Sequence, residues 1–578
     1  MNRHEAGPRS PWPRPATALR ETLAEGYGAA AFRRDLLAGA VVGIVALPLS
    51  MALAIASGVP PAHGLYTAIV AGGLIPLLGG SRVQVSGPTA AFVVILAPIS
   101  QRFGVGGLLL ATLMAGAILF AMGVMRLGRF IEFVPYPVTT GFTAGIAVVI
   151  ATLQVKDLLG LTVKDMPEHF VERVQALALA LPTVHWPDVA IGALTLAVLV
   201  AWPRLTRRVP APLVALLIGA GAAAIAARFF GFDAATIATR FTYRVRSVVG
   251  HGIPPLPPLP VLPWSLPGPG GKPLALSFSV FRELLPSAFA IAVLGAIESL
   301  LSAVVADGMT GRKHDPDAEL MAQGTGNLVA PFFGGFAATG AIARTATNVR
   351  AGGRSPFAAV VHAVVVLLAV LLFAPLLGRL PMASLAALLL FVAWNMSELD
   401  HFAHMLKVAP RHDVAILVTC FLLTVLFDMV VAVSVGVVMA ALLFMQRMAE
   451  VSGVRLVDQH PILLDRPLPK GVLVYEIAGP LFFGAAQKAM AALQGVDTGV
   501  RVVLLDLRSV PALDATGLVG LESAFERLNR AGVLVVIAGA QPQPLRVMAR
   551  AGWADRKGRV AVYGSFERAV EEVRKAFE

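Results

Sequence analysis

Residues 290–353 combine apolar segments with a few isolated ionisable side chains. The stretch opens with an apolar run of helix length that carries one carboxylate, Glu298, near its middle. It closes with small and polar residues around one cation, Arg344. An ionisable group at membrane depth costs roughly 2.5–3.5 kcal/mol on insertion scales, and it usually marks a substrate or ion pathway. Glu298 and Arg344 are therefore the first candidates for a functional site.

The chemistry that this stretch predicts is anion binding. Arg344 lies in a segment of small residues that follows Gly334 and Gly335. A helix that begins there leaves backbone N–H groups free at its N-terminus, and these favour an anion. An alternative stays open at this point: Glu298 could pair with Arg344 and brace the structure, because a buried ion pair satisfies both charges without binding a ligand.

The composition predicts a polytopic membrane protein. Of 578 residues, 57% are hydrophobic and only 14% are charged, whereas a soluble domain has about a quarter charged residues. The net charge of +12 could indicate nucleic acid, but the basic residues cluster at the ends of apolar segments. This pattern is typical of positive-inside topology, so we expect membrane lipid and no nucleic acid as a partner. The single cysteine, Cys420, excludes an intramolecular disulfide.

Fourteen apolar segments are candidate membrane spans. They are residues 36–56, 66–78, 89–99, 106–125, 138–153, 189–202, 212–227, 284–306, 320–333, 340–351, 357–377, 385–394, 415–428 and 430–445. Arg and Lys follow the even-numbered segments, which predicts a multi-pass protein of the cell (inner) membrane with both termini in the cytosol. We expect residues 1–34 to form a cytosolic arm and residues 35–447 to form the membrane domain.

Two short segments, 83–88 and 335–340, occupy corresponding places seven spans apart. Paired broken segments indicate an inverted repeat of seven plus seven spans with a binding site at the repeat interface. Pro88 suits the first turn of one helix and Thr339 could cap the other, so that both N-termini would face the midplane. The alternative is that both segments are ordinary kinks.

The remaining chain, residues 455–578, reads as a small α/β domain that is too polar for lipid. We expect strands at 471–477, 502–507, 533–538 and 560–563, and helices at 485–493, 512–530, 544–551 and 565–577.

These pieces together resemble the sulfate permease (SulP) family of anion transporters, which join a membrane domain to a cytosolic STAS domain. The residues that carry the resemblance are Ala46-Leu47-Pro48, Gly58-Val59-Pro60-Pro61, Gly64-Leu65-Tyr66, Val85-Ser86-Gly87-Pro88-Thr89-Ala90, Gly141-Phe142-Thr143-Ala144-Gly145, Gly295-Ala296-Ile297-Glu298-Ser299-Leu300, Asn327-Leu328-Val329-Ala330, Leu505-Asp506-Leu507 and Asp514-Ala515-Thr516-Gly517. Each motif alone is weak, but the ordered set is specific.

The resemblance implies a core domain that moves against a gate domain in an elevator-like manner, in the fold shared with uracil transporters, and a homodimer. It implies secondary active transport of a small inorganic anion (sulfate, bicarbonate or similar, or a dicarboxylate) and no enzyme activity. No cofactor is expected beyond a coupling ion, H⁺ or Na⁺. No cluster of residues has the spacing of a metal site.

The resemblance also implies a set of site residues. The substrate-binding residues would be Pro48, Leu49, Leu53, Ser86, Thr89, Ala90, Gly340, Ala341, Ala343 and Arg344. The coupling ion would bind Glu298 and Ser302, which lie four residues apart on one helix face. Sodium-coupled bicarbonate relatives have Asp where this chain has Glu298, and the longer Glu favours a proton. Many eukaryotic relatives have Gln at the position of Leu49.

Two other functions are compatible with the sequence. An uncoupled anion channel would use the same scaffold, and a membrane-tethered signalling protein would use the STAS domain. In anti-sigma antagonists of the STAS fold, the residue directly after the Asp is phosphorylated. That residue is Ala515 here, which has no hydroxyl group, so phosphorylation at this position is excluded.

Overall fold

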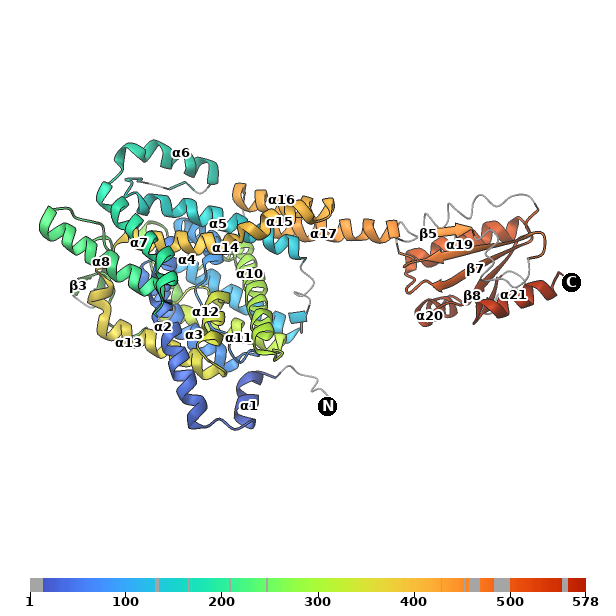
Figure 1. Cartoon of the computed structure of the whole chain (residues 1–578), viewed down its shortest axis with the longest axis horizontal. Helices are drawn as coiled ribbons and strands as arrows, with labels where there is room; N and C mark the ends of the chain where they lie inside the picture. Colours follow the sequence, from blue (N-terminus) through green and yellow to red (C-terminus); the bar gives the residue numbers. More distant parts are fainter. Residues whose placement is uncertain are drawn as a thin grey trace. The chain divides into compact units, whose positions relative to one another are not determined.

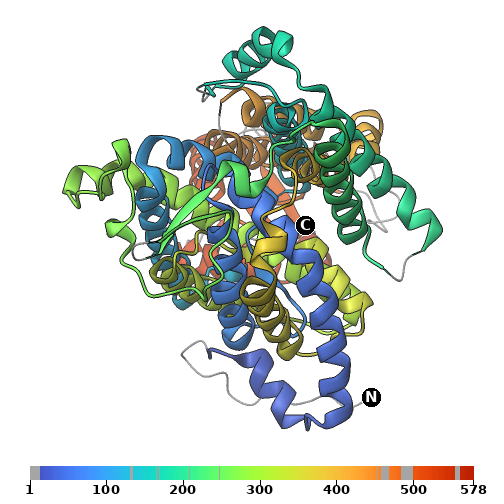
Figure 2. The same ribbon diagram turned by 90° about the vertical axis from the view of Figure 1, so that its left-hand side faces the viewer.

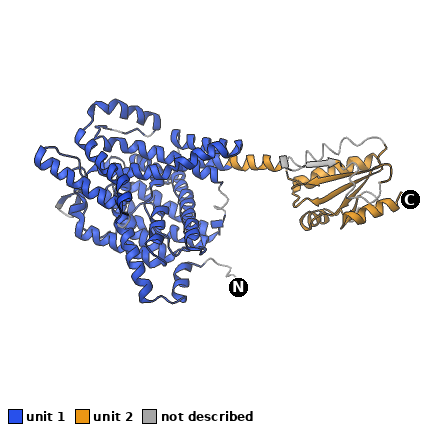
Figure 3. Cartoon of the chain, viewed as in Figure 1, with its two compact units in different colours: residues 1–437 blue, residues 438–578 orange. Residues whose placement is uncertain are grey.

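A computed structural model shows the chain as a large helical part and a small α/β part (Figure 1 and Figure 2). It divides into two compact units, residues 1–437 and 438–578, and each is described by itself (Figure 3). The residues that the structure describes are 14–129, 135–164, 166–167, 169–206, 209–245, 248–427, 429–451, 453–456, 468–482, 499–553 and 560–577.

The first unit is almost entirely helical. Its helices are α1 (Thr17–Ala24), α2 (Ala29–Ala56), α3 (Pro61–Leu78), α4 (Ala90–Val124), α5 (Tyr136–Leu158), α6 (Phe170–Ala180), α7 (Trp186–Leu205), α8 (Ala211–Phe230), α9 (Ile237–Arg240), α10 (Phe278–Thr310), α11 (Pro316–Val329), α12 (Ile342–Arg350), α13 (Pro356–Leu377), α14 (Met382–Ser397), α15 (Leu399–Val408) and α16 (Arg411–Leu426). Its strands are β1 (Ser86–Gly87), β2 (Thr242–Val245), β3 (Val248–His251) and β4 (Thr339–Gly340). A further helix, α17 (Met429–Val451), crosses the boundary between the units.

Each of the fourteen predicted spans overlaps a helix of the structure. The third and fourth lie in one helix, α4, which is interrupted at Gly104, where φ is 67°. That left-handed conformation suits glycine, so the break follows from the sequence. Ten helices within the described residues are long and apolar enough to cross a membrane. The others are shorter, α12 having only 9 residues, so the count of fourteen crossings stays a prediction.

Local signals explain where the helices of the candidate site begin and end. Helix α10 ends because Gly311 adopts φ 72°, which places its backbone outside the helical region. Helix α11 begins after Asp315, whose carboxylate accepts hydrogen bonds from the backbone N–H groups of Asp317 and Ala318. The turn between α10 and α11 is therefore fixed from both sides.

The packing of the first unit is that of two repeats. If the spans of the first half are exchanged for those of the second, the largest helix contacts map onto other observed contacts. Helix α2 packs on α13 as α10 packs on α4, and α3 packs on α13 as α11 packs on α4. Helix α14 packs on both α5 and α7, as α5 packs on both α14 and α16. This pattern agrees with the predicted inverted repeat, in which corresponding helices lie seven spans apart.

The second unit is an α/β domain. Its five-stranded sheet has the order β5 (Gly453–Leu456), β6 (Val472–Ala478), β7 (Val502–Ser509), β8 (Leu534–Ala538) and β9 (Val560–Tyr563). All neighbours are parallel except β5 and β6, and β5 was not predicted. The helices are α19 (Ala515–Arg530), α20 (Pro542–Arg550) and α21 (Phe566–Lys575). The predicted helix at 485–493 lies outside the described residues.

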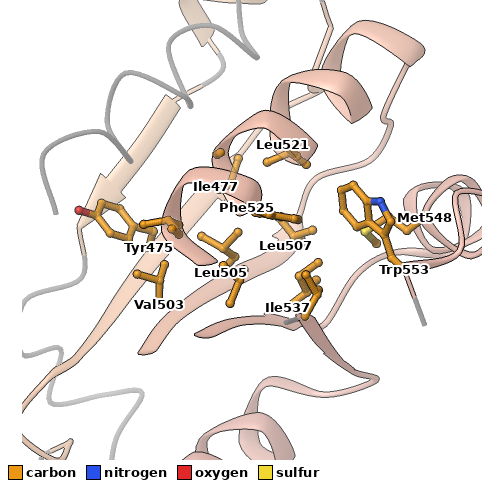
Figure 4. Close-up of a cluster of buried hydrophobic side chains, with 14 of the residues drawn as sticks. Tyr475, Ile477, Val503, Leu505, Leu507, Leu521, Phe525, Ile537, Met548 and Trp553 are labelled. Carbon is orange, nitrogen blue, oxygen red and sulfur yellow. The ribbon is translucent and has the colours of Figure 1, made fainter. Parts of the chain in front are cut away.

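Side chains along the strands point alternately to the two faces of the sheet, and each face has its own hydrophobic core. Tyr475, Leu505 and Ile537 point to the face covered by α19, where Phe525 and Trp553 complete a buried cluster (Figure 4). The opposite face packs against α21. At the start of α19, Asp514 accepts a hydrogen bond from the backbone N–H of Gly517 (2.7 Å). Its neighbour Ala515 is the first helical residue, three positions after the predicted start of this helix at residue 512.

Candidate functional site

The candidate site lies where the two predicted broken segments meet. Strands β1 and β4 pair antiparallel, with Ser86 opposite Gly340 and Gly87 opposite Thr339. Each strand leads into a helix, β1 into α4 and β4 into α12. Because the strands are antiparallel, the helices run away from the pair in opposite directions and both N-termini face it. The sequence therefore predicted this arrangement correctly.

The details of the two helix starts differ from the prediction. Pro88 lies before Thr89, the residue that precedes α4, and so outside the first turn. Thr339 does not cap α12, because the preceding residue is Ala341. Neither helix has a side-chain cap among the described residues. The first backbone N–H groups of a helix have no acceptor within it, so both starts leave donors available to a ligand.

A buried carboxylate positions the segment before β1. Glu319 of α11 is 1% exposed and accepts four hydrogen bonds. Two come from the backbone N–H groups of Gly80 (3.0 Å) and Ser81 (3.2 Å). The other two come from the side-chain amides of Gln84 and Gln323 (both 3.0 Å). Glu319 was not predicted as a site residue. Its donors at residues 80–84 lie more than 230 positions from it along the chain.

A second set of buried polar groups positions β4. Asn327 of α11 forms two hydrogen bonds with the backbone of Ala338, donating to its carbonyl and accepting from its N–H (both 2.8 Å). Ser299 of α10 lies 2.7 Å from the hydroxyl of Thr339 and accepts from the N–H of Gly340 (3.0 Å). The hydroxyl that was expected to cap α12 thus fixes β4 to α10 instead.

Helix α12 is tied to the other half of the chain through β1. The hydroxyl of Thr345 accepts hydrogen bonds from the backbone N–H of Val85 and from Ser302 (both 3.1 Å). The amide of Asn348 donates to the carbonyl of Val83 (2.8 Å). Ser302 was predicted to bind a coupling ion together with Glu298, and this stays a prediction; in the structure its hydroxyl donates to Thr345 of α12.

Glu298 lies beside the start of α4. Its Oε2 accepts a hydrogen bond from the hydroxyl of Thr89 (2.8 Å), and its side chain is half-buried. Glu298 and Arg344 both belong to the described residues, and they form no ion pair with each other. The bracing alternative is therefore absent from this structure, and the carboxylate remains available to a coupling ion.

Arg344 is a buried cation with free donors. The residue is 2% exposed, and its Nη2 donates to the carbonyl of Pro88. Its Nε and Nη1 have no hydrogen-bond partner among the described residues. Nη1 lies against Gly87, where an added Cβ would collide with it. A buried guanidinium with unused N–H groups is costly without a partner, so this position favours an anion.

The other predicted substrate residues surround this position at different degrees of burial. Ser86 is fully buried and accepts from Gln323 (3.0 Å), so its hydroxyl is engaged within the protein. Leu49 is partly exposed and Ala343 is exposed. The remaining ones are buried: Pro48, Leu53, Thr89, Ala90, Gly340 and Ala341. Helix α2 contacts both α4 and α12, so all three predicted segments meet.

The sequence model of the sulfate permease family matches residues 32–420, about two thirds of the chain. The chain belongs to this family. A STAS domain matches residues 464–569, within the second unit. The chain is therefore a polytopic membrane transporter with a C-terminal STAS domain, and it is no enzyme.

Known proteins agree with this family assignment. YvdB of Bacillus subtilis, which is named as a sulfate transporter, is 40% identical over 93% of this chain and 96% of its own length. The bicarbonate transporter BicA of Picosynechococcus sp. is 29% identical over 89% of this chain and 90% of its own. The structure of the murine anion transporter Slc26a9 in its inward-facing state superposes with a TM-score of 0.82, covering 97% of this chain and 94% of that one. Its 19% identity shows a shared fold.

Proposed function

We propose that this sulfate permease family member is a secondary carrier of a small inorganic anion, of the sulfate or bicarbonate class. The anion binds between the N-termini of α4 and α12, beside Arg344. The observation that carries the proposal is the guanidinium of Arg344, which is buried against β1 and has two nitrogens without a hydrogen-bond partner among the described residues. Backbone N–H groups at both helix starts add donors without adding charge.

The substrate class rests on the relatives and on the chemistry of the residues at the two helix starts. YvdB is named for sulfate and BicA for bicarbonate. Both are small oxyanions whose oxygens accept hydrogen bonds from N–H groups, and neither needs an aromatic or apolar pocket. One cation with helix N-termini suits an anion of this kind.

Glu298 is proposed as the coupling group. It lies on α10 beside Thr89, the residue that precedes α4. A proton or a bound Na⁺ would neutralise its charge and ease the approach of an anion to the same helix start. The longer side chain of Glu, compared with the Asp of sodium-coupled relatives, favours the proton.

Transport proceeds by movement of a core against a gate. The two-repeat packing of α2–α4 with α10–α13 supports a core, and α5 with α7, α14 and α16 supports a gate. The positively charged ends of the predicted spans support an orientation with both termini in the cytosol, and the family supports a homodimer. The membrane domain would cover residues 35–447 and the STAS domain residues 455–578.

Uptake into proteoliposomes tests the proposed function. Purified protein would be reconstituted, and influx of labelled sulfate and bicarbonate would be measured with H⁺ and Na⁺ gradients imposed separately. The proposal predicts accumulation of at least one anion above equilibrium, driven by one of these gradients. Downhill flux with single-channel current in a bilayer would indicate a channel, and absence of flux for both anions would contradict the proposed substrate class.

A further inference from the structure

A cavity lies in the first unit, apart from the candidate site at the starts of α4 and α12. It has a volume of about 550 Å³ and is formed by the end of α1, the start of α2 and the C-terminal ends of α10 and α12. None of the predicted substrate or coupling residues lines it. Helix α1 lies at one edge of the first unit in both views (Figure 1 and Figure 2). The proposed topology puts this edge in the cytosol.

The acidic side chains that line the cavity are all engaged. Glu25 pairs with Arg82 (2.6 Å) and Arg312 (2.9 Å). Asp35 accepts from the hydroxyl of Tyr27 (2.9 Å), from the backbone N–H of residue 354 (2.9 Å) and from the hydroxyl of residue 355. Asp307 is bound by the ring and the backbone N–H of residue 314. The lining carries three carboxylates against five Arg and Lys side chains, so its net charge is positive.

The remaining cations of the lining are free. Arg34, Lys313 and Arg354 are exposed, and their side chains form no ion pair with any residue that the structure describes. They surround the cavity from three different segments: the start of α2, the turn after α10 and the turn after α12. Arg and Lys together are the usual ligands of phosphate groups, Arg as a planar fork and Lys as a point charge.

A buried histidine gives an independent indication of a ligand. The side chain of His314 is only 6% exposed, and its Nδ1 lies 2.8 Å from Oδ2 of Asp307. Its Nε2 is buried in the lining and has no hydrogen-bond partner among the described residues. The carboxylate fixes the orientation of the ring. An unsatisfied buried nitrogen is costly, so this position favours a ligand.

We propose that this cavity binds a phosphate-bearing anion, held by Lys313, Arg354 and Arg34 and contacting His314. Ligand pockets span roughly 300–1,000 Å³, so this volume exceeds what a single sulfate or bicarbonate needs. The phosphate belongs either to a soluble phosphorylated metabolite or to the headgroup of an anionic phospholipid. A bound phosphate would link the ends of α10 and α12, the two helices that carry Glu298 and Arg344.

Binding of radiolabelled pyrophosphate to the full chain in detergent tests this proposal. The double variant Lys313→Ala/Arg354→Ala should lose about tenfold or more in affinity, because each side chain gives a charge-assisted contact. The matched control Arg350→Ala/Lys407→Ala removes the same charge from exposed positions outside the cavity and should bind like the wild type. Gradient-driven sulfate or bicarbonate uptake by the double variant should be retained, which shows that it folds.

Further variants separate this cavity from the transport site and identify the source of the phosphate. Arg344→Ala should leave pyrophosphate affinity unchanged. In nanodiscs of phosphatidylcholine with one fifth phosphatidylglycerol, weaker pyrophosphate binding than in pure phosphatidylcholine assigns the cavity to a lipid headgroup, and equal binding assigns it to a soluble phosphate. Equal affinity of the wild type and the Lys313/Arg354 variant, or loss of binding in Arg344→Ala alone, would overturn the proposal. Neither result depends on whether the chain transports sulfate.

Discussion

Arg344 of α12 donates a hydrogen bond to the carbonyl of Pro88, which lies in the other half of the chain. This contact crosses between the two repeats and holds a cation at the start of α4. It occupies only one of the guanidinium nitrogens, since Nε and Nη1 remain without partners among the described residues. The repeats thus create, at the point where they meet, a place that is positive and rich in donors.

The first prediction concerns the coupling ion. Glu298→Gln removes a titratable carboxylate but can still accept the hydrogen bond from Thr89. If the coupling ion is a proton, the variant should lose uptake driven by an inward H⁺ gradient, and anion binding should become less dependent on pH. If it is sodium, Na⁺ stimulation should vanish while the pH dependence hardly changes. Glu298→Asp, which keeps the carboxylate, serves as the control; wild-type uptake by Glu298→Gln would leave the carboxylate a structural role.

The second prediction concerns the support of β4. Asn327→Ala removes both hydrogen bonds to the buried backbone of Ala338, and each unsatisfied group costs about 1–3 kcal/mol. The variant should therefore melt at a lower temperature and bind the anion more weakly. Thr325→Ala on the same helix removes only a local bond to the carbonyl of Met321 and should change the melting temperature little. Scanning fluorimetry of both purified variants makes the comparison, and equal melting temperatures would exclude Asn327 as a support.

The third prediction concerns the pH dependence of α1 docking. Hydrogen bonds from Arg82 and then Arg312 lower the pKa of Glu25 to about 2, from an ordinary value of 4.5. Because the folded-state pKa is depressed, the stabilisation is fully present above pH 4.5 and is lost as the pH falls toward 2. Hydrogen exchange of α1, corrected for the intrinsic rate, should show constant protection from pH 7 to pH 5. Glu25→Gln should reduce that protection already at pH 7.

The exposed position of this ion pair limits the size of the effect, since such pairs contribute little individually. High salt should reduce protection in the wild type more than in Glu25→Gln, because screening acts on the charge that the variant lacks. Protection that falls between pH 7 and pH 5 in the wild type would contradict the assignment to Glu25.

The sequence predicted the architecture of the site well. Hydrophobic runs located all fourteen segments, and the paired short segments 83–88 and 335–340 located β1 and β4. These features depend on residues close together in the sequence. The resemblance to the sulfate permease family added the identity of the C-terminal domain as a STAS domain, and the comparisons confirm both the family and this domain.

The polar supports of the site could not be predicted in this way. Glu319 accepts hydrogen bonds from the backbone of residues 80 and 81, and Ser302 donates one to Thr345. Helical spacing puts Ser302 and Glu298 on one face, but it does not determine which neighbouring helix each side chain meets. Thr339 has the residue type of a helix cap, but α12 begins after Ala341, and the Thr339 hydroxyl donates to the carbonyl of Gly295 on α10. Such choices are decided by tertiary packing.

Anion affinity of Arg344 variants tests the central claim most directly. Isothermal titration of purified wild type, Arg344→Ala and Arg344→Lys with the transported anion would be compared with Arg350→Ala on the same helix. The account predicts a loss of about tenfold to a hundredfold for Arg344→Ala, since a hydrogen bond to a charged group contributes about 1.5–3 kcal/mol. Lys should restore part of the affinity, and Arg350→Ala should bind like the wild type. Wild-type affinity in a well-folded Arg344→Ala variant would contradict the claim and remove Arg344 from the site.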